Sequence, residues 1–240
     1  MASVETHVSS GSGKKVRAWD GPTRLFKWSL VTLIVCGYLS NKFGASVPGW
    51  HKWNGYTILI LLVFRLLWGF VGGSTARFAA FVDWPWNAAA YGLALLKGKS
   101  PKYLGHNPLG GYMVLALMGL AGLQVLTGLY SGDEDRIVIE GPLAKTIADA
   151  SVVFATKIHH YVFDGIVVLA LVHIGVNLFY TFGKKDPLIQ GMVTGYKPAE
   201  AYADMPEAQP GSPVAAVVCL VIAAFVVLGG ITLMGGNIFK

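Results

Sequence analysis

The sequence is poor in charge and in cysteine, and each shortage excludes a class of protein. Only 13% of the residues are charged, whereas 54% are hydrophobic and the mean hydropathy is +0.54. These values lie outside the usual range of soluble domains and predict an all-α integral membrane protein. The two cysteines, Cys36 and Cys219, both lie within apolar stretches. That placement argues against a disulfide framework and against a thiolate metal site.

Common catalytic motifs are missing as well. The chain has no nucleotide-binding loop, no Ser-His-Asp order and no thiolate cluster, so we expect no self-contained catalytic centre. Its net charge of +6 indicates no nucleic-acid partner, because most Lys and Arg residues fall in short loops beside apolar runs. Residues 1–20 lack the apolar core and the cleavage site of a secretory signal peptide. We expect them to form a cytoplasmic tail, with the first apolar run acting as the insertion signal.

Five apolar runs are long enough to cross a hydrocarbon layer about 30 Å thick. They cover about residues 24–42, 53–72, 109–131, 159–182 and 213–235. The first four predict a four-helix transmembrane bundle within residues 21–197. The last predicts a fifth, C-terminal transmembrane helix within residues 213–240, which packs on the bundle or binds a partner. Residues 198–212, rich in Pro, Ala and Glu, are expected to link the two parts.

The basic residues are concentrated in alternate loops. They precede the first run, fill the loop after the second and follow the fourth, whereas the 132–158 connection is acidic. The positive-inside rule predicts a cytoplasmic N-terminus and, after an odd number of spans, a C-terminus on the other side, which for the inner membrane of a Gram-negative cell is the periplasm. The stretch 84–96, with Trp84, Trp86 and Tyr91, is too short to span and is expected at the cytoplasmic interface.

Four histidines lie at or inside the ends of the apolar runs: His51, His106, His159 and His173. His159 and His173 are fourteen residues apart on one run, which in an α-helix is roughly 21 Å and nearly four complete turns. Both imidazoles therefore face about the same way, one near each side of the bilayer. Such a helix can hold two haems, because imidazole is the common nitrogen ligand of electron-carrying haem iron. For any one histidine, packing within the span is the alternative interpretation.

His51 and His159 are expected at the same outer depth, from which they can ligate one haem iron from opposite faces. Two histidines at matched depth on different helices are hard to explain as packing. His160 is turned by about 100° from its neighbour and nearly away from His173, so we expect it to support the site or face solvent.

His173 marks an inner level, where the sequence leaves the second ligand of a haem iron unassigned. Lys27 and His106 both approach from the cytoplasmic side. A lysine ligates iron only as the neutral amine and otherwise extends toward phosphate or a haem propionate. His106 can ligate the iron or donate to a propionate. Arg65, fourteen residues after His51, shares its face at the inner depth and suits a propionate or, alternatively, lipid headgroups.

At these residues the sequence resembles the bacterial cytochrome b561 superfamily of membrane di-haem cytochromes, which includes the cytochrome b subunits of nickel-iron hydrogenases. The likeness extends over about residues 16–197. It is carried by the His159 and His173 pair and by residues 16–26, 50–55, 64–69 and 105–110. The resemblance implies an outer haem held at His51 and His159, and an inner haem held at His173 and by a histidine in the first span.

The sequence departs from the family in the first span, where the motif Phe-His-Trp is replaced by Phe26-Lys27-Trp28. Three outcomes are open: the inner haem is lost, Lys27 ligates it, or His106 or water takes the empty position. Retention with altered ligation is the favoured interpretation. Mixed ligation would shift the redox potential, because axial-ligand identity is a main determinant of haem potential.

The resemblance implies an electron-transfer cytochrome b with one or two b-type haems, which passes electrons between the quinone pool and a periplasmic c-type cytochrome or dehydrogenase subunit. Quinol oxidation or quinone reduction would be its only catalysis. An acidic group is expected to dock a lysine-rimmed cytochrome c, and it comprises Asp133, Glu134, Asp135 and Glu140. The alternatives are a membrane anchor and electron conduit for a hydrogenase or another oxidoreductase, and a haem-free transporter or structural membrane protein.

Overall fold

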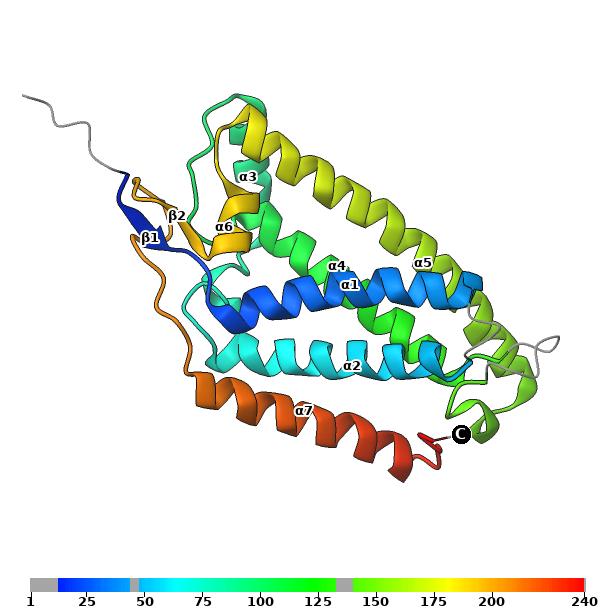
Figure 1. The fold of residues 1–240 in the computed structure, drawn as a ribbon. Coiled ribbons are helices and arrows are strands. Elements are labelled where there is room, and N and C mark those ends of the chain that lie inside the picture. The colour runs from blue at the N-terminus through cyan, green and yellow to red at the C-terminus, as the bar shows by residue number, and fades with distance from the viewer. Residues whose placement is uncertain (1–12, 44–47, 133–139, 240) are drawn as a thin grey trace, which may run out of the picture.

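A computed structural model describes residues 13–43, 48–132 and 140–239, which form a bundle of long helices with a small sheet at one end (Figure 1). The long helices are α1 (Gly21–Phe43), α2 (Pro48–Val71), α4 (Pro108–Tyr130), α5 (Asp149–Leu178) and α7 (Pro213–Leu233). The shorter elements are β1 (Lys15–Arg17), η2 (Phe78–Ala80), α3 (Pro85–Leu96), η3 (Ala144–Thr146), the π-helical turn η4 (Phe179–Gly183), α6 (Leu188–Thr194) and β2 (Tyr196–Pro198).

Four of the helices are long and apolar enough to cross a membrane: α2, α4, α5 continued by η4, and α7. They confirm the predicted all-α architecture and four of the five expected spans, by length and composition. Helix α1 is not among them; it carries Arg24, Lys27 and Lys42. The first span therefore stays a prediction. Helix α5 begins at Asp149, ten residues before the expected span, so His159 lies well inside the helix.

Local sequence explains where two of the spans begin. Asn107 accepts a hydrogen bond from the backbone nitrogen of Gly110 at 2.8 Å, and Ser212 accepts one from that of Ala215 at 3.4 Å. A proline follows each cap in the first turn, where a backbone donor would have no helical partner. Both helices thus start at a polar cap directly before a long apolar run.

The long helices pack in a defined order. Helix α1 packs against α2, α4 packs against α5, and α7 lies along α2 (Figure 1). Their buried core contains Phe26, Ile58, Leu62, Phe64, Trp68, Val125, Cys219 and Ala223. Because Cys219 and Ala223 of α7 belong to this core, α7 is packed as part of the bundle.

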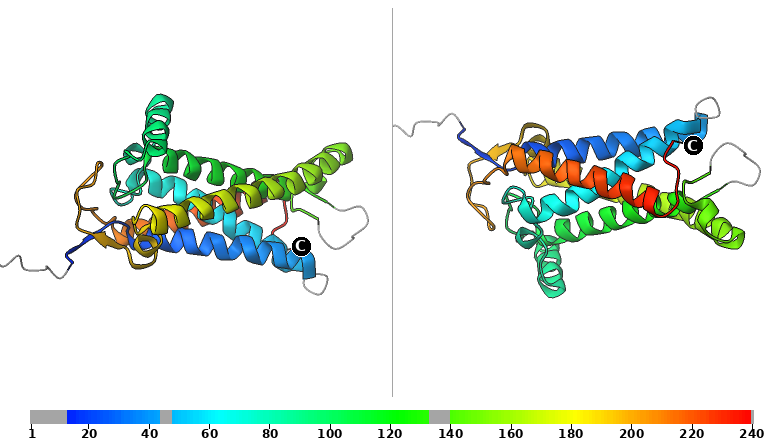
Figure 2. Two further views of the ribbon diagram at one scale, coloured as in Figure 1. Left: turned by 90° about the horizontal axis from the view of Figure 1, so that it is seen from above. Right: turned by 90° about the horizontal axis from the view of Figure 1, so that it is seen from below.

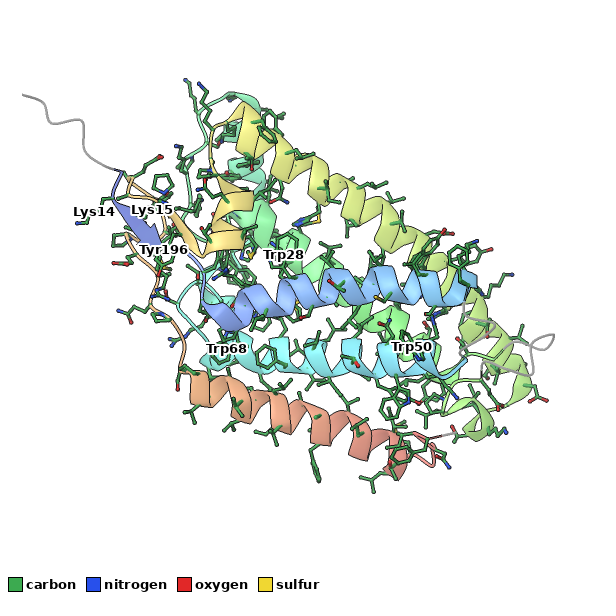
Figure 3. The ribbon with its side chains drawn as sticks, viewed as in Figure 1. Lys14, Lys15, Trp28, Trp50, Trp68 and Tyr196 are labelled. Carbon is green, nitrogen blue, oxygen red and sulfur yellow. The ribbon has the colours of Figure 1, made fainter. Side chains whose placement is uncertain are left out.

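The end of the bundle at which α1 begins is closed by the sheet. Strands β1 and β2 pair antiparallel there. Lys15 is the first residue of β1, and Lys14 precedes it (Figure 3). Helix α3 projects sideways from this end (Figure 2), and its Trp86 stacks on Trp84 with ring centres 4.9 Å apart. Both rings are largely exposed. This position suits the expected interfacial role of α3, which stays a prediction.

The expected linker between β2 and α7 has no helix but is fastened to the bundle. The carboxylate of Asp204 accepts hydrogen bonds from the backbone nitrogens of Leu104 at 2.7 Å and Gly105 at 2.9 Å. The backbone nitrogen of Ala208 donates to the carbonyl of Arg17 at 2.8 Å. The segment therefore joins the N-terminal strand to the start of α4.

The buried carboxylate of Asp20 connects three parts of the chain at the same end. Its Oδ1 accepts a hydrogen bond from the backbone nitrogen of Thr23 at 2.9 Å, which caps α1. Its Oδ2 accepts hydrogen bonds from Trp68 Nε1 at 3.2 Å, from the nitrogen of Gly73 at 3.0 Å and from that of Gly211 at 3.4 Å. The start of α1, the end of α2 and the approach to α7 are thus held together.

Candidate functional site

Described residues of the bundle line an outer and an inner cavity. The outer cavity, of about 200 Å³, is enclosed by α1, α2, α4 and α5, and its lining includes His51, His159 and His160. The inner cavity, of about 470 Å³, lies nearer the sheet and is lined by Lys27, His106 and His173 together with residues of α3, α4 and α6. The structure therefore brings together the histidines expected at the outer level and gathers the three candidates of the inner level.

His51 on α2 and His159 on α5 face the same cavity from different helices. Their ring centres are 6.3 Å apart, and the ring planes are inclined by 76°. Two imidazoles that bind one metal ion from opposite sides have ring centres about 6 Å apart. Each side contributes a metal–nitrogen bond of roughly 2 Å and the distance from that nitrogen to the centre of its ring. The pair is therefore spaced for one shared metal ion. His160 is exposed, with its ring centre 6.2 Å from that of His159.

Hydrogen bonds to Nδ1 leave Nε2 as the acceptor nitrogen on both outer histidines. The Nδ1 of His159 lies 2.8 Å from the carbonyl oxygen of Gln124, which can only accept, so Nδ1 is the donor. The hydroxyl of Ser40 donates to the carbonyl of Gly37 at 2.9 Å, so its oxygen accepts from His51 Nδ1 at 3.0 Å. In a neutral imidazole the second nitrogen then carries the lone pair, which is the form that ligates metals. On His159 the amide of Gln124 donates to that nitrogen at 3.0 Å and would have to turn away for ligation.

Helix α4 shapes the space around His159. The side-chain nitrogen of Gln124 lies 3.0 Å from His159 Nε2, the atom that the Nδ1 bond leaves as an acceptor. A Cβ added to Gly128 would meet His159 Cε1 at 3.0 Å, so a side chain at this position would press on the ring. A glycine is therefore required opposite the imidazole if the ring is to keep its place.

At the inner level, Lys27 of α1 and His173 of α5 line one cavity. The amide nitrogen of Asn177, one turn further along α5, lies 3.2 Å from His173 Nε2. Within the part of the chain that the structure describes, Lys27 has no hydrogen-bond or ion-pair partner and is half-buried. Lys27 therefore faces the cavity that also holds the inner histidine.

His106 lies in the loop before α4, with its ring 4.7 Å from that of Trp19 and 4.9 Å from that of Phe81. Its Nδ1 is buried and has no hydrogen-bond partner among the described residues. Burial, reinforced by the Lys27 charge, lowers the pKa of His106 well below its usual range. Both sequence hypotheses for His106, ligation of iron and donation to a propionate, remain predictions.

Arg65 does not reach the membrane surface. It is 2% exposed, donates through Nη2 to the carbonyl of Ala76 at 3.0 Å, and lies over the rings of Phe78 and Phe81. Its Nη1 is buried without a partner among the described residues, and Arg65 is not one of the residues that line the inner cavity. This placement speaks against the headgroup alternative and leaves a buried donor free for an anionic group.

Residues 18–195 match a family model described as prokaryotic cytochrome b561. The chain belongs to the prokaryotic cytochrome b561 family. It is similar to the probable Ni/Fe-hydrogenase B-type cytochrome subunit of Azotobacter vinelandii, with 31% identity over 139 residues, 45% of this chain and 58% of the relative. The protein of the same name from Azotobacter chroococcum mcd 1 gives the same identity and coverage. The match thus spans little more than half the length of these relatives.

Membership of the cytochrome b561 family confirms the resemblance drawn from the sequence. That family is one of b-type cytochromes of membrane electron transport, which implies haem b and a multi-pass membrane protein. The residues present fit that group. Among the described residues no three His, Cys, Asp or Glu side chains gather to hold a metal ion, whereas His51 and His159 supply two imidazoles. Two axial nitrogens suit an iron whose other four ligands come from a macrocycle.

Sequence reasoning missed the residues that hold the outer histidines, above all Ser40 and Gln124. Each is a polar side chain within an apolar run, and that signal could have singled them out. It also missed the buried ion pair of Lys197 Nζ with Asp186 Oδ1, at 2.7 Å, beside the inner cavity. Burial lowers the pKa of Lys197 and the neighbouring carboxylate counteracts the shift. No sequence spacing points to that pairing.

Proposed function

We propose that this cytochrome carries electrons across the membrane through b-type haem, between the quinone pool and a periplasmic redox partner. The observation that best supports the proposal is the pairing of His51 with His159, whose ring centres are 6.3 Å apart. When bound, haem supplies one-electron chemistry, because its iron alternates between the ferrous and ferric states. The protein residues hold the iron from both faces and keep the site within the bundle.

Each site residue has a proposed task. His51 and His159 ligate the outer iron, with Ser40 and Gln124 orienting their rings through Nδ1. His173 ligates an inner iron, with Lys27 or His106 as the second ligand. Arg65, whose Nη1 is buried and free among the described residues, is available to an anionic group such as a propionate.

The outer site is tested by counting haem. The purified protein should show a reduced-minus-oxidised spectrum of haem b, and the pyridine haemochrome should fall by one haem per polypeptide in His51→Ala and in His159→Ala. The matched control is His160→Ala, which removes the exposed neighbouring imidazole and should keep the full content. Unchanged haem content in both ligand variants would contradict the proposal. A purified protein without haem would favour the transporter or structural alternative.

The electron donor and acceptor are tested separately from the haem. A short-chain quinol should reduce the haem of the purified protein, and oxidised c-type cytochrome should then reoxidise it. The acidic group expected to dock such a partner lies outside the described residues except for Glu140, which forms an exposed ion pair with Lys145 at 3.1 Å. Neutralising Asp133, Glu134, Asp135 and Glu140 together should slow reoxidation most at low salt, because charge complementarity acts chiefly on association.

A second candidate function is that of membrane anchor and electron conduit for a hydrogenase. It is favoured by the names of the two Azotobacter relatives, both probable Ni/Fe-hydrogenase cytochrome subunits. Hydrogen gas should then reduce the haem in native membranes, and a nickel-iron subunit should co-purify in stoichiometric amount. Haem reduction by quinol but not by hydrogen, with no such subunit, would favour the first proposal.

A further inference from the structure

We propose that the inner haem iron is held by Lys27 and His173, an amine and an imidazole, and that His106 is not its ligand. The inference rests on the proposed function, since it requires a haem at the inner level. It follows from the depth of each residue along its helix, measured from the contacts that define the outer site.

Hydrogen bonds at the outer site mark one common level on three helices. On α1 that level is Ser40, whose hydroxyl contacts His51 Nδ1 at 3.0 Å. On α4 it is Gln124, whose carbonyl contacts His159 Nδ1 at 2.8 Å, and on α5 it is His159 itself. Helices α1 and α4 run toward this level from the sheet end, and α5 runs away from it (Figure 1).

Lys27 and His173 lie at nearly the same distance from the outer level. Lys27 precedes Ser40 by thirteen residues on α1, and His173 follows His159 by fourteen on α5. At about 1.5 Å per residue these separations are roughly 20 Å and roughly 21 Å. The two residues therefore lie at similar distances along their helices from the outer level, and both line the inner cavity.

His106 lies further toward the sheet end. It precedes Gln124 by eighteen residues, and α4 begins only at Pro108. The residue of α4 at the inner level is Gly110, fourteen before Gln124, so His106 is four residues and about 6 Å beyond that level. Its ring is also held between Trp19 and Phe81. That position suits contact with the edge of a haem better than ligation of its iron.

The surroundings of Lys27 agree with ligation. Its ammonium group has no carboxylate or carbonyl partner among the described residues, and its side chain lines the cavity. To hold the iron, Lys27 would have to be the neutral amine, and its proton would pass to solvent. The aliphatic stem gives the nitrogen the reach that a shorter side chain would lack.

The test compares spectra of variants of the full-length purified protein. The wild type should bind two haems and show two low-spin ferric signals in near-infrared magnetic circular dichroism, one of bis-imidazole and one of amine–imidazole type. Lys27→His should keep two haems and convert the second signal to the bis-imidazole type. Lys27→Leu should abolish the amine–imidazole signal, leaving a high-spin haem or one haem instead of two. The outer signal in the same sample reports that the variant has folded.

Two controls complete the test. Lys42→Leu removes another lysine of α1, and His106→Phe removes the competing imidazole; both should keep both signals. A wild type with one haem, an unchanged spectrum in Lys27→Leu, or loss of the inner signal in His106→Phe would overturn the inference. If His51→Ala still removes one haem while Lys27→Leu changes nothing, only the inference fails. If neither changes the haem content, the proposed function fails as well.

Discussion

At the residue scale, the outer site depends on which nitrogen of each histidine is engaged by the protein. Ser40→Ala removes the acceptor of the His51 Nδ1 proton, which makes the imidazole a weaker electron donor to iron. We expect the haem to be retained and the midpoint potential of the outer haem to rise, because the ferric state loses more stabilisation than the ferrous state. A redox titration followed at the haem band measures this shift. Ser29→Ala, on the same helix, should leave the potential unchanged.

The same scale shows what spacing can and cannot predict. The juxtaposition of His51 with His159 could be predicted, because two residues on predicted spans have calculable depths. The roles of Ser40 and Gln124 could not, since a hydrogen bond depends on the rotation of each helix about its axis as well as on depth. For the same reason the sequence could not decide between a propionate and lipid headgroups as the partner of Arg65. Its depth was predictable, but its burial over Phe78 comes from the turn that follows α2.

At the element scale, α4 depends on a glycine where it faces the outer imidazole. In Gly128→Ala the new Cβ would lie 3.0 Å from His159 Cε1, so the ring must shift by a few tenths of an ångström. Overpacking of this kind typically costs about 1–3 kcal/mol. We expect lower outer haem content and a lower melting temperature, measured by haem absorbance during heating. Gly122→Ala is the matched control on α4, because a Cβ there meets nothing within 4 Å.

Element boundaries were predictable to different degrees for a physical reason. The start of α4 follows from Asn107 and the proline after it, which form a local cap. The extension of α5 back to Asp149 was not predicted, because residues 149–158 are mixed in polarity and precede the apolar run. The attachment of the segment before α7 was not foreseen either. It depends on Asp204, whose partner Gly105 is 99 residues away in the sequence, and on Asp20, whose partner Gly211 is 191 residues away.

At the whole-molecule scale, the pairing of β1 with β2 decides where the N-terminus lies. Strand β2 follows α5 and precedes α7, so the sheet fixes residues 15–17 at the inner end of both spans. Helix α1 begins there and ends where Ser40 meets His51, in the first turn of α2 (Figure 1). Its 23 residues extend about 34 Å, more than the roughly 30 Å of a hydrocarbon core. We therefore expect α1 to cross the membrane despite its charges, which makes five crossings.

Five crossings place the two termini on opposite sides, and cysteine labelling of intact spheroplasts tests this arrangement. In a background of Cys36→Ala and Cys219→Ala, a membrane-impermeant maleimide should label Phe239→Cys, because that residue is 82% exposed near the C-terminus. Lys14→Cys should react only after permeabilisation, since the basic N-terminal end is expected in the cytoplasm. Labelling of both Lys14→Cys and Phe239→Cys in intact spheroplasts would mean that α1 does not cross.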